Sequence, residues 1–254
     1  MRRIKNLLWS FGVDIKVARR APAGIVRYLR DRHAFRVASA HEPEALPLGH
    51  DFPVFHDYSE SAGTARGHYF HMDLWAARRI YTVNPTRHID IGSRIDGFVA
   101  HVLSFREIEV IDVRPLESVV HGLTFVQADA TTLSEFPDSS VESISCLHAA
   151  EHFGLGRYGD PIDPLAYRKL LNALQRILAP GGRLYFAVPI GVERVEFNAH
   201  RVFDPERIIG ELSLLELVNF GAVEDDGSLS SDVQPADYRS ARMACGLYEF
   251  IKRE

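Results

Sequence analysis

One stretch constrains the fold more than any other, and it runs from His88 to Val113. Apolar and β-branched residues lead to Asp90, Gly92 follows, and apolar residues then recur at the spacing of one helix face. A second short apolar run, residues 109–113, ends the stretch. Strand, tight turn, helix and strand within about 30 residues form the βαβ unit that builds parallel sheets. The sequence therefore predicts an α/β fold with a parallel sheet.

The turn at Gly92 indicates which kind of ligand the sheet binds. Ligands of parallel sheets bind past the carboxyl ends of the strands, where Gly92 and Asp112 both fall. An acid about 20 residues after a glycine turn is placed to accept hydrogen bonds from two ribose hydroxyls. A dinucleotide site needs further glycines near the pyrophosphate, and Arg94 stands at the second glycine position. We therefore expect a nucleoside ligand.

The motif Asp90-Ile91-Gly92 resembles motif I of class I S-adenosylmethionine (SAM)-dependent methyltransferases. Residues 68–75 and 88–98 resemble a narrower bacterial family of methyltransferase-like proteins, often associated with surface-polysaccharide genes. This resemblance covers roughly residues 55–252. The usual D-x-G-x-G-x-G motif is altered, because Arg94 and Asp96 stand at its later glycine positions.

The resemblance implies a doubly wound, mostly parallel, seven-stranded Rossmann-like sheet whose last strand is antiparallel at the edge. It implies SAM as cofactor and S-adenosylhomocysteine as product. Asp129 matches the acid that binds the adenine amino group, and Asp90 is expected to orient the turn and face the ligand's ammonium group. Alternatively, Ser93-x-x-Asp96 is a capping box for the following helix. The expected cofactor-binding residues are Asp90, Gly92, Ser93, Arg94, Gly97, Asp112, Val113, Asp129, Ala130 and His148.

The segment after the fourth predicted strand reads His148-x-x-Glu151-His152. Alone it matches the H-x-x-E-H zinc-hydrolase pattern, but it directly follows a strand of the nucleoside-binding sheet. Methyltransferases often carry a similar triplet at this place, so we expect no metal site. A hydroxyl acceptor needs a base, and histidine suits neutral pH. His152, and His200 after the fifth strand, are the predicted bases.

The remaining elements are expected as alternating strands and helices within a domain at 67–254. The expected helices are 70–81, 95–104, 164–178 and 205–212, and the expected strands are 88–91, 109–113, 123–128, 141–147, 183–189, 214–222 and 246–252.

The amino-terminal residues differ in charge from the rest of the chain. Residues 1–37 hold ten Lys or Arg against two Asp, a balance of +8, so the remainder carries −13 of the total −5. We expect residues 1–66 to form a basic helical arm and an irregular connection. The arm is either a solvated pair of helices or a contact with an anionic membrane surface.

Two cysteines, Cys146 and Cys245, lie in apolar segments and are interpreted as small core residues of a reducing compartment. No apolar run approaches the roughly 20 residues that span a bilayer. The protein is therefore expected in the cytoplasm, with peripheral contact to the inner face of the membrane as the alternative.

The favoured function is SAM-dependent O-methylation of a sugar or surface-polysaccharide precursor. The saccharide acceptor follows from the family association alone. One alternative is a non-catalytic SAM-fold protein, which Arg94 and Asp96 in the glycine loop support. Another is an NAD-dependent sugar enzyme, disfavoured by the missing pyrophosphate glycines. Nucleic acid is not expected as a partner, because the core is acidic and has no basic patch with interleaved aromatic residues.

Overall fold

The computed structural model describes residues 11–12, 15–55, 57–59 and 61–254 of the chain. These belong to two compact units, Met1–Thr64 and Ala65–Glu254. The first of the two predicted arm helices falls mainly outside the described residues.

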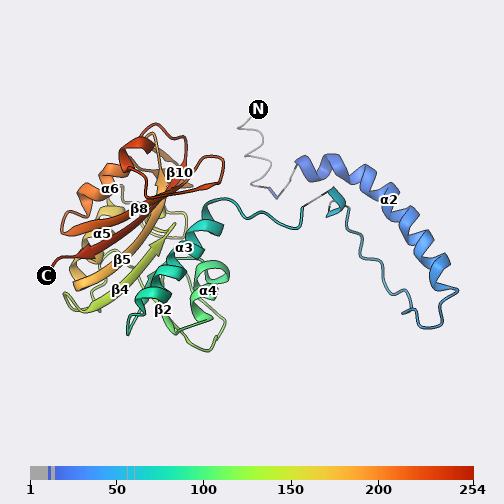
Figure 1. The fold of residues 1–254 in the computed structure, drawn as a ribbon, viewed down its shortest axis with the longest axis horizontal. Coiled ribbons are helices and arrows are strands. Elements are labelled where there is room, and N and C mark those ends of the chain that lie inside the picture. Colours follow the sequence, from blue (N-terminus) through green and yellow to red (C-terminus); the bar gives the residue numbers. More distant parts are fainter. Residues whose placement is uncertain (1–10, 13–14, 56, 60) are drawn as a thin grey trace. The chain divides into compact units, whose positions relative to one another are not determined.

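The first unit consists of helix α2 (Ile15–Ser39), a connection and a single turn, η1 (Asp57–Ser59). The connection packs back along the helix (Figure 1). Arg32 Nε donates to Asp51 Oδ1 at 2.8 Å, and the rings of Tyr28 and Phe55 meet edge to face at 6.0 Å. No helix in the described part of the chain is long and apolar enough to cross a membrane.

The second unit is built on an eight-stranded sheet in the order β3-β2-β1-β4-β5-β10-β8-β9. The first five strands in this order are parallel to one another, and β10 is antiparallel to both of its neighbours. The strands are β1 (Ile89–Ile91), β2 (Ile108–Asp112), β3 (Leu123–Gln127), β4 (Val141–Leu147), β5 (Leu178–Ile190), β8 (Leu215–Val223), β9 (Leu229–Ser231) and β10 (Ala244–Lys252). The predicted doubly wound, mostly parallel α/β class is confirmed.

Two details of the predicted sheet are wrong. The last strand, β10, lies between β5 and β8 and not at the edge. Its residues Ala244 to Phe250 are all buried, as a strand paired on both sides requires. The eighth strand, β9, was not expected because three residues carry no detectable alternation.

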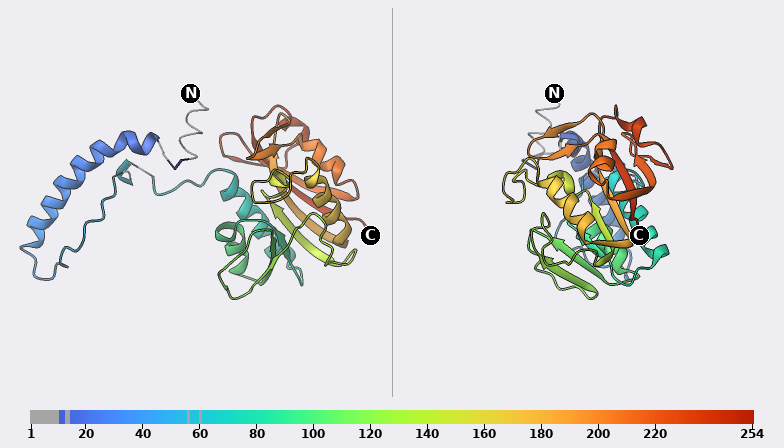
Figure 2. Two further views of the ribbon diagram at one scale, coloured as in Figure 1. Left: turned by 180° about the vertical axis from the view of Figure 1, so that it is seen from behind. Right: turned by 90° about the vertical axis from the view of Figure 1, so that its left-hand side faces the viewer.

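Helices and turns cover both faces of the sheet (Figures 1 and 2). One buried core includes residues of α5 and α6, and the other includes residues of α3, η2 and α4. The helical elements are α3 (His68–Val83), η2 (Ile95–Val99), α4 (Ala100–Leu103), η3 (Ala150–His152), α5 (Ala166–Ile177), α6 (Pro205–Glu211) and η4 (Pro235–Tyr238). A short hairpin, β6 (Arg194–Glu196) and β7 (His200–Val202), follows β5.

The predicted helix 95–104 begins as the π-helical turn η2 and continues as α4. The predicted capping box is wrong, since neither of its side chains bonds to a helix amide. Ser93 Oγ donates to Asp90, and Asp96 accepts from Arg94. The strand expected at 183–189 begins earlier, because β5 starts irregularly at Leu178.

Candidate functional site

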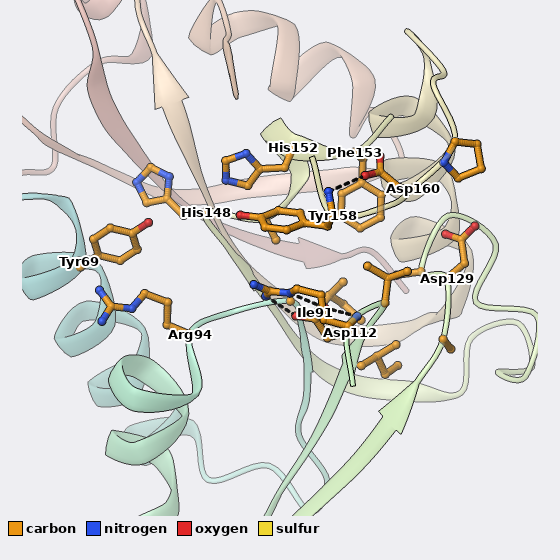
Figure 3. Close-up of a pocket in the computed structure, with 18 residues that line it drawn as sticks. Tyr69, Ile91, Arg94, Asp112, Asp129, His148, His152, Phe153, Tyr158 and Asp160 are labelled. Atoms are coloured by element: carbon orange, nitrogen blue, oxygen red, sulfur yellow. Dashed lines mark hydrogen bonds and ion pairs between the residues drawn. The ribbon is translucent and has the colours of Figure 1, made fainter. Parts of the chain in front are cut away.

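A cavity opens at the carboxyl ends of β1, β2 and β4 (Figure 3). Its empty space, including the open mouth, is about 830 Å³. Eight of the predicted site residues line it: Gly92, Arg94, Asp112, Val113, Asp129, Ala130, His148 and His152. Parallel strands that end side by side bring these distant residues together.

The glycine turn shapes one wall of the cavity. Gly92 has φ +68°, which favours glycine, and its amide donates to Ile111 O at 2.9 Å. A Cβ at Gly92 would stand 3.1 Å from the Ala149 side chain. The turn therefore requires the glycine that the sequence motif placed there.

Asp90 holds the turn from beneath and does not line the cavity. Its side chain is fully buried and accepts from the Ser93 amide at 2.9 Å and from Ser93 Oγ at 2.6 Å. Ser145 Oγ donates to the same carboxylate at 2.5 Å. Burial raises the pKa of Asp90 to about 6. The prediction that Asp90 faces the ligand needs correction, because its hydrogen bonds all serve the fold.

A buried histidine completes this set of hydrogen bonds. Because Ser145 gives its one proton to Asp90, its oxygen accepts from His88 Nε2 at 3.0 Å. Ser143 Oγ lies 2.8 Å from His88 Nδ1 and donates to it. Burial lowers the pKa of His88 to about 3, so the ring is neutral at pH 7. We call His88, Asp90, Ser93, Ser143 and Ser145 the turn network.

Gly97 and Ser93 also lie outside the main cavity. A Cβ at Gly97 would meet Asp73 Oδ2 at 2.5 Å, so this glycine permits close packing of η2 on α3. Asp73 is buried there, and burial raises its pKa to about 6. Gly97 therefore serves packing, and Ser93 serves the turn.

Arg94 replaces the second glycine with a positive charge at the cavity wall. Its guanidinium donates to Asp96 at 3.1 and 3.0 Å and lies 4.7 Å from the centre of the Tyr69 ring. The Arg94 and Asp96 side chains are 49% and 78% exposed, so solvent competes with this ion pair. Figure 3 shows Arg94, Tyr69 and His148 at one end of the cavity and Asp129 at the other.

Asp112 lies between these two ends, and its carboxylate is already paired in this structure (Figure 3). Arg114 donates to it through Nε at 3.0 Å, Nη2 at 2.6 Å and the backbone amide at 2.8 Å. The Arg114 guanidinium also lies 4.5 Å from the centre of the Tyr158 ring. A ribose can reach both oxygens of Asp112 only after the Arg114 side chain has turned away.

The far end of the cavity is formed by Asp129, Ala130 and Val113. Asp129 Oδ1 accepts from the Thr131 amide at 2.9 Å, so this carboxylate both shapes its turn and faces the cavity. Asp160 holds the loop that carries Tyr158 by accepting three backbone amides. No motif in the sequence indicates this use of Asp160.

A second cavity adjoins the first. The two share four wall residues, Tyr69, His148, His152 and Tyr158. His68, Glu151, Arg157, Pro189, His200 and Met243 complete the second cavity. Four of its wall residues are histidines, and we call His68, His148, His152 and His200 the cavity histidines. No motif in the sequence links His68 to the other three histidines.

His148 forms a buried ion pair with Glu151, whose Oε1 is 2.5 Å from His148 Nδ1. Burial alone would lower the pKa of His148, but the charges of Cys245 and Glu151 outweigh it and hold this pKa well above 6.5. Burial would raise the pKa of Glu151, but His148 lowers it. Glu151 Oε2 is buried and makes no hydrogen bond among the described residues.

The two predicted bases differ in how they are held. His152 Nδ1 donates to Ala199 O at 2.7 Å, which fixes the tautomer and leaves Nε2 to accept a proton. His200 Nε2 is buried without a hydrogen bond in the described part of the chain, 3.6 Å from Glu196 Oε2. Burial lowers the pKa of both rings, so both are neutral at pH 7. His152 borders both cavities, and His200 borders only the second.

Arg201 supports this region from below. Its guanidinium donates to three carbonyl oxygens, at Phe153 (2.6 Å), Glu151 (3.3 Å) and Pro164 (3.3 Å). The residue is only 5% exposed. Arg201 therefore fixes the backbone that carries Glu151 and His152.

Comparisons with known proteins support the fold. A family model described as "Caenorhabditis protein of unknown function, DUF268" matches residues 120–239, just under half of the chain. No curated protein matches the chain significantly.

Among solved structures, the chain is similar to the [4+2]-cyclase SpnF, with TM-score 0.53, 14% identity and coverage of 72% of this chain and 80% of that one. It is also similar to a proposed sarcosine dimethylglycine methyltransferase from Galdieria sulphuraria, with TM-score 0.52, 11% identity and coverage of 72% and 86%. The N-methyltransferase NodS from Bradyrhizobium japonicum, solved with S-adenosylhomocysteine, has TM-score 0.49, 15% identity and coverage of 74% and 89%. The strand order and the similarities to the first two of these structures show a fold of the class I methyltransferase type.

Proposed function

We propose that this chain is a SAM-dependent O-methyltransferase. One observation carries the proposal: a cavity with acids suited to an adenosine shares a wall with a cavity lined by four histidines. An adenosyl ligand in the first cavity and a hydroxyl acceptor in the second would meet at that wall. Fold similarity alone does not decide the reaction, since one similar structure is a cyclase.

The residues of the first cavity fit SAM along its whole length. Asp112 would accept the ribose hydroxyls, and Asp129 would accept the adenine amino group. At the opposite end, Arg94 would pair with the methionine carboxylate of SAM. In this proposal, the Arg94 guanidinium replaces a backbone contact that the usual glycine loop makes with the ligand. Arg94 is therefore compatible with SAM binding.

When bound, SAM supplies a methyl group on a positively charged sulfur, and S-adenosylhomocysteine remains. His152 Nε2 would take the proton of the acceptor hydroxyl as its oxygen forms the new bond to the methyl carbon. The Ala199 carbonyl holds the ring in the tautomer that this step requires. The other cavity residues orient the acceptor for in-line attack.

The acceptor is proposed to be a sugar or a precursor of a surface polysaccharide. Its cavity offers polar contacts from Arg157, Tyr158, Glu151 and His200, which suit a polyhydroxylated molecule. The family resemblance of residues 68–75 and 88–98 favours the same class.

Titration calorimetry tests the cofactor directly. Wild-type protein should bind SAM and S-adenosylhomocysteine but not NAD. Asp112→Ala should lower the affinity by about 100-fold, because two hydrogen bonds to a charged group are lost. Glu109→Ala, at the amino-terminal side of the same strand, is the matched control. Binding of NAD in place of the adenosyl ligands would contradict the proposal.

A non-catalytic binding protein is the second candidate, because Arg114 occupies the carboxylate of Asp112 in this structure. Such a protein would bind S-adenosylhomocysteine weakly and release no methyl group to any sugar acceptor. Incubation with SAM labelled at its methyl group and a panel of nucleotide sugars separates the two candidates.

The basic arm is proposed to rest on an anionic membrane surface, as the excess of positive charge in residues 1–37 favours. Co-sedimentation with vesicles containing anionic lipid should fall after deletion of residues 1–37 and in high salt. Unchanged co-sedimentation after the deletion would exclude this contact.

A further inference from the structure

A cluster of three metal-binding side chains lies beside the ion pair of His148 and Glu151. His68 begins helix α3, His148 follows strand β4, and Cys245 lies in strand β10. One potential ligand atom from each residue lies within 4.8 Å of the other two. Elements far apart in sequence thus bring two imidazoles and a thiol to one point.

The spacing of the two imidazoles is close to that of a metal site. His68 Nδ1 and His148 Nε2 are 3.1 Å apart. Two nitrogens bound to one tetrahedral ion at 2.0–2.1 Å stand about 3.3 Å apart. A sulfur ligand would lie about 3.6 Å from each nitrogen, so closure around an ion needs a shift of at most about 1 Å at Cys245.

The other ring nitrogen of His148 has the partner that metal-bound histidines normally have. Nδ1 donates to the Glu151 carboxylate, which leaves Nε2 directed at His68. A carboxylate behind a metal-bound imidazole orients the ring and makes it a stronger ligand. Glu151 is 1% exposed and its Oε2 has no hydrogen bond among the described residues, so one oxygen of this carboxylate is buried without a hydrogen-bond partner.

The donor set selects the class of ion. Imidazole and thiolate ligands favour Zn²⁺ and related transition ions over Mg²⁺ or Ca²⁺, which prefer oxygen. His68 and His148 both line the second cavity, whereas Cys245 is fully buried. A fourth coordination position would therefore face the cavity.

We propose that His68, His148 and Cys245 form a three-ligand site for a transition-metal ion, Zn²⁺ in the simplest case, with an open position toward the histidine-lined cavity. This site differs from the zinc-hydrolase pattern in the sequence. His152 is not one of its ligands, because the close group of potential ligand atoms comprises only His68, His148 and Cys245 among the described residues. The proposal is independent of SAM and of the proposed reaction.

Cobalt spectroscopy tests the site on the full chain after treatment with a chelator. One equivalent of Co²⁺ should give the intense visible bands of a tetrahedral site and a near-ultraviolet thiolate-to-cobalt band, and Zn²⁺ should displace it. Cys245→Ser should remove the thiolate band. Cys146→Ser is the matched control, because Cys146 is equally buried but belongs to the core on the other face of the sheet.

A second pair of variants keeps the test decisive if the Cys245→Ser protein fails to fold. His68→Asn should abolish the tetrahedral bands, and His71→Asn, one helical turn away and outside both cavities, should retain them. Glu151→Gln should weaken Zn²⁺ binding by about 10- to 100-fold. Weak octahedral bands in the wild type, or a thiolate band that survives Cys245→Ser, would overturn the proposal and leave the two histidines sharing only a proton.

Discussion

The turn network is buried and the cavity histidines are half-buried, and these two polar clusters differ in how completely their polar atoms are hydrogen-bonded. In the turn network, His88 uses both ring nitrogens and Asp90 accepts from two serines and an amide. Among the cavity histidines, His200 Nε2 has no hydrogen bond among the described residues, and neither has the nearby Glu151 Oε2.

This difference separates a structural role from a chemical one. A buried polar group without a partner costs free energy, so a fully bonded cluster can serve the fold alone. A cluster that leaves atoms unbonded beside a cavity has capacity for a ligand, a proton or an ion. Both clusters place histidine beside an acid, and they differ in how many of their polar atoms have a hydrogen bond.

The largest expected effect is on catalysis at His152. His152→Gln should lower turnover by about 10²- to 10⁴-fold, because a general base is lost. Its free energy of unfolding should change by no more than about 1 kcal/mol, since the bond to Ala199 O is the one side-chain hydrogen bond that His152 makes among the described residues. Methyl-transfer assays and urea unfolding give the two values, with His121→Gln on the surface as control. Equal turnover in His152→Gln and wild type would exclude His152 as the base.

The next effect is on stability at His88. His88→Ala should lower the free energy of unfolding by about 3 kcal/mol, because two serines lose a partner and a cavity forms. Ser143→Ala, which removes one of these bonds, should cost only about 1 kcal/mol. Urea unfolding measures both. If His88→Ala lowers the free energy of unfolding no more than His152→Gln does, the two clusters do not differ in structural role.

A smaller effect is expected where an ion pair competes with the ligand. Arg114→Ala should raise the affinity for S-adenosylhomocysteine by about fivefold, because freeing Asp112 removes a partly exposed ion pair that contributes about 1 kcal/mol. Arg87→Ala, which breaks the comparable pair with Glu109, should leave affinity unchanged. Titration calorimetry measures the affinity of both variants. Weaker binding in Arg114→Ala would show that Arg114 contacts the ligand.

The smallest expected effect is on the pH dependence of kcat/KM, which should be nearly flat. Burial lowers the pKa of His152, so the base stays neutral and active as the pH falls from about 8 through 6.5. The profile of kcat/KM should therefore decline only below pH 6.5. A decline centred above pH 6.5 would assign the base to a group with a raised pKa.

The sequence predicted the parts of the site that follow from strand ends. Gly92, Asp112 and Asp129 each follow a parallel strand, and the rule that such ends meet placed them in one cavity. The sequence does not show whether an acid at a strand end faces the ligand or points into the protein. Asp90 points into the protein because Ser145, 55 residues away on β4, donates to it.

The histidine cluster was predictable only in part. His148 and His152 are close in sequence, and their place after β4 indicated a pocket. His68 lies 80 residues from His148, and no local pattern reports a contact over that distance. Cys245 was interpreted as a plain core residue because nothing in its strand indicates two facing imidazoles.

A crystal structure with S-adenosylhomocysteine tests the central claim most directly. The account predicts adenine at Asp129, the ribose on Asp112 with Arg114 turned away, and the carboxylate on Arg94. The ligand sulfur should then face the wall formed by Tyr69, His148, His152 and Tyr158. A ligand bound with its sulfur away from that wall, or with Arg114 still on Asp112, would contradict the account.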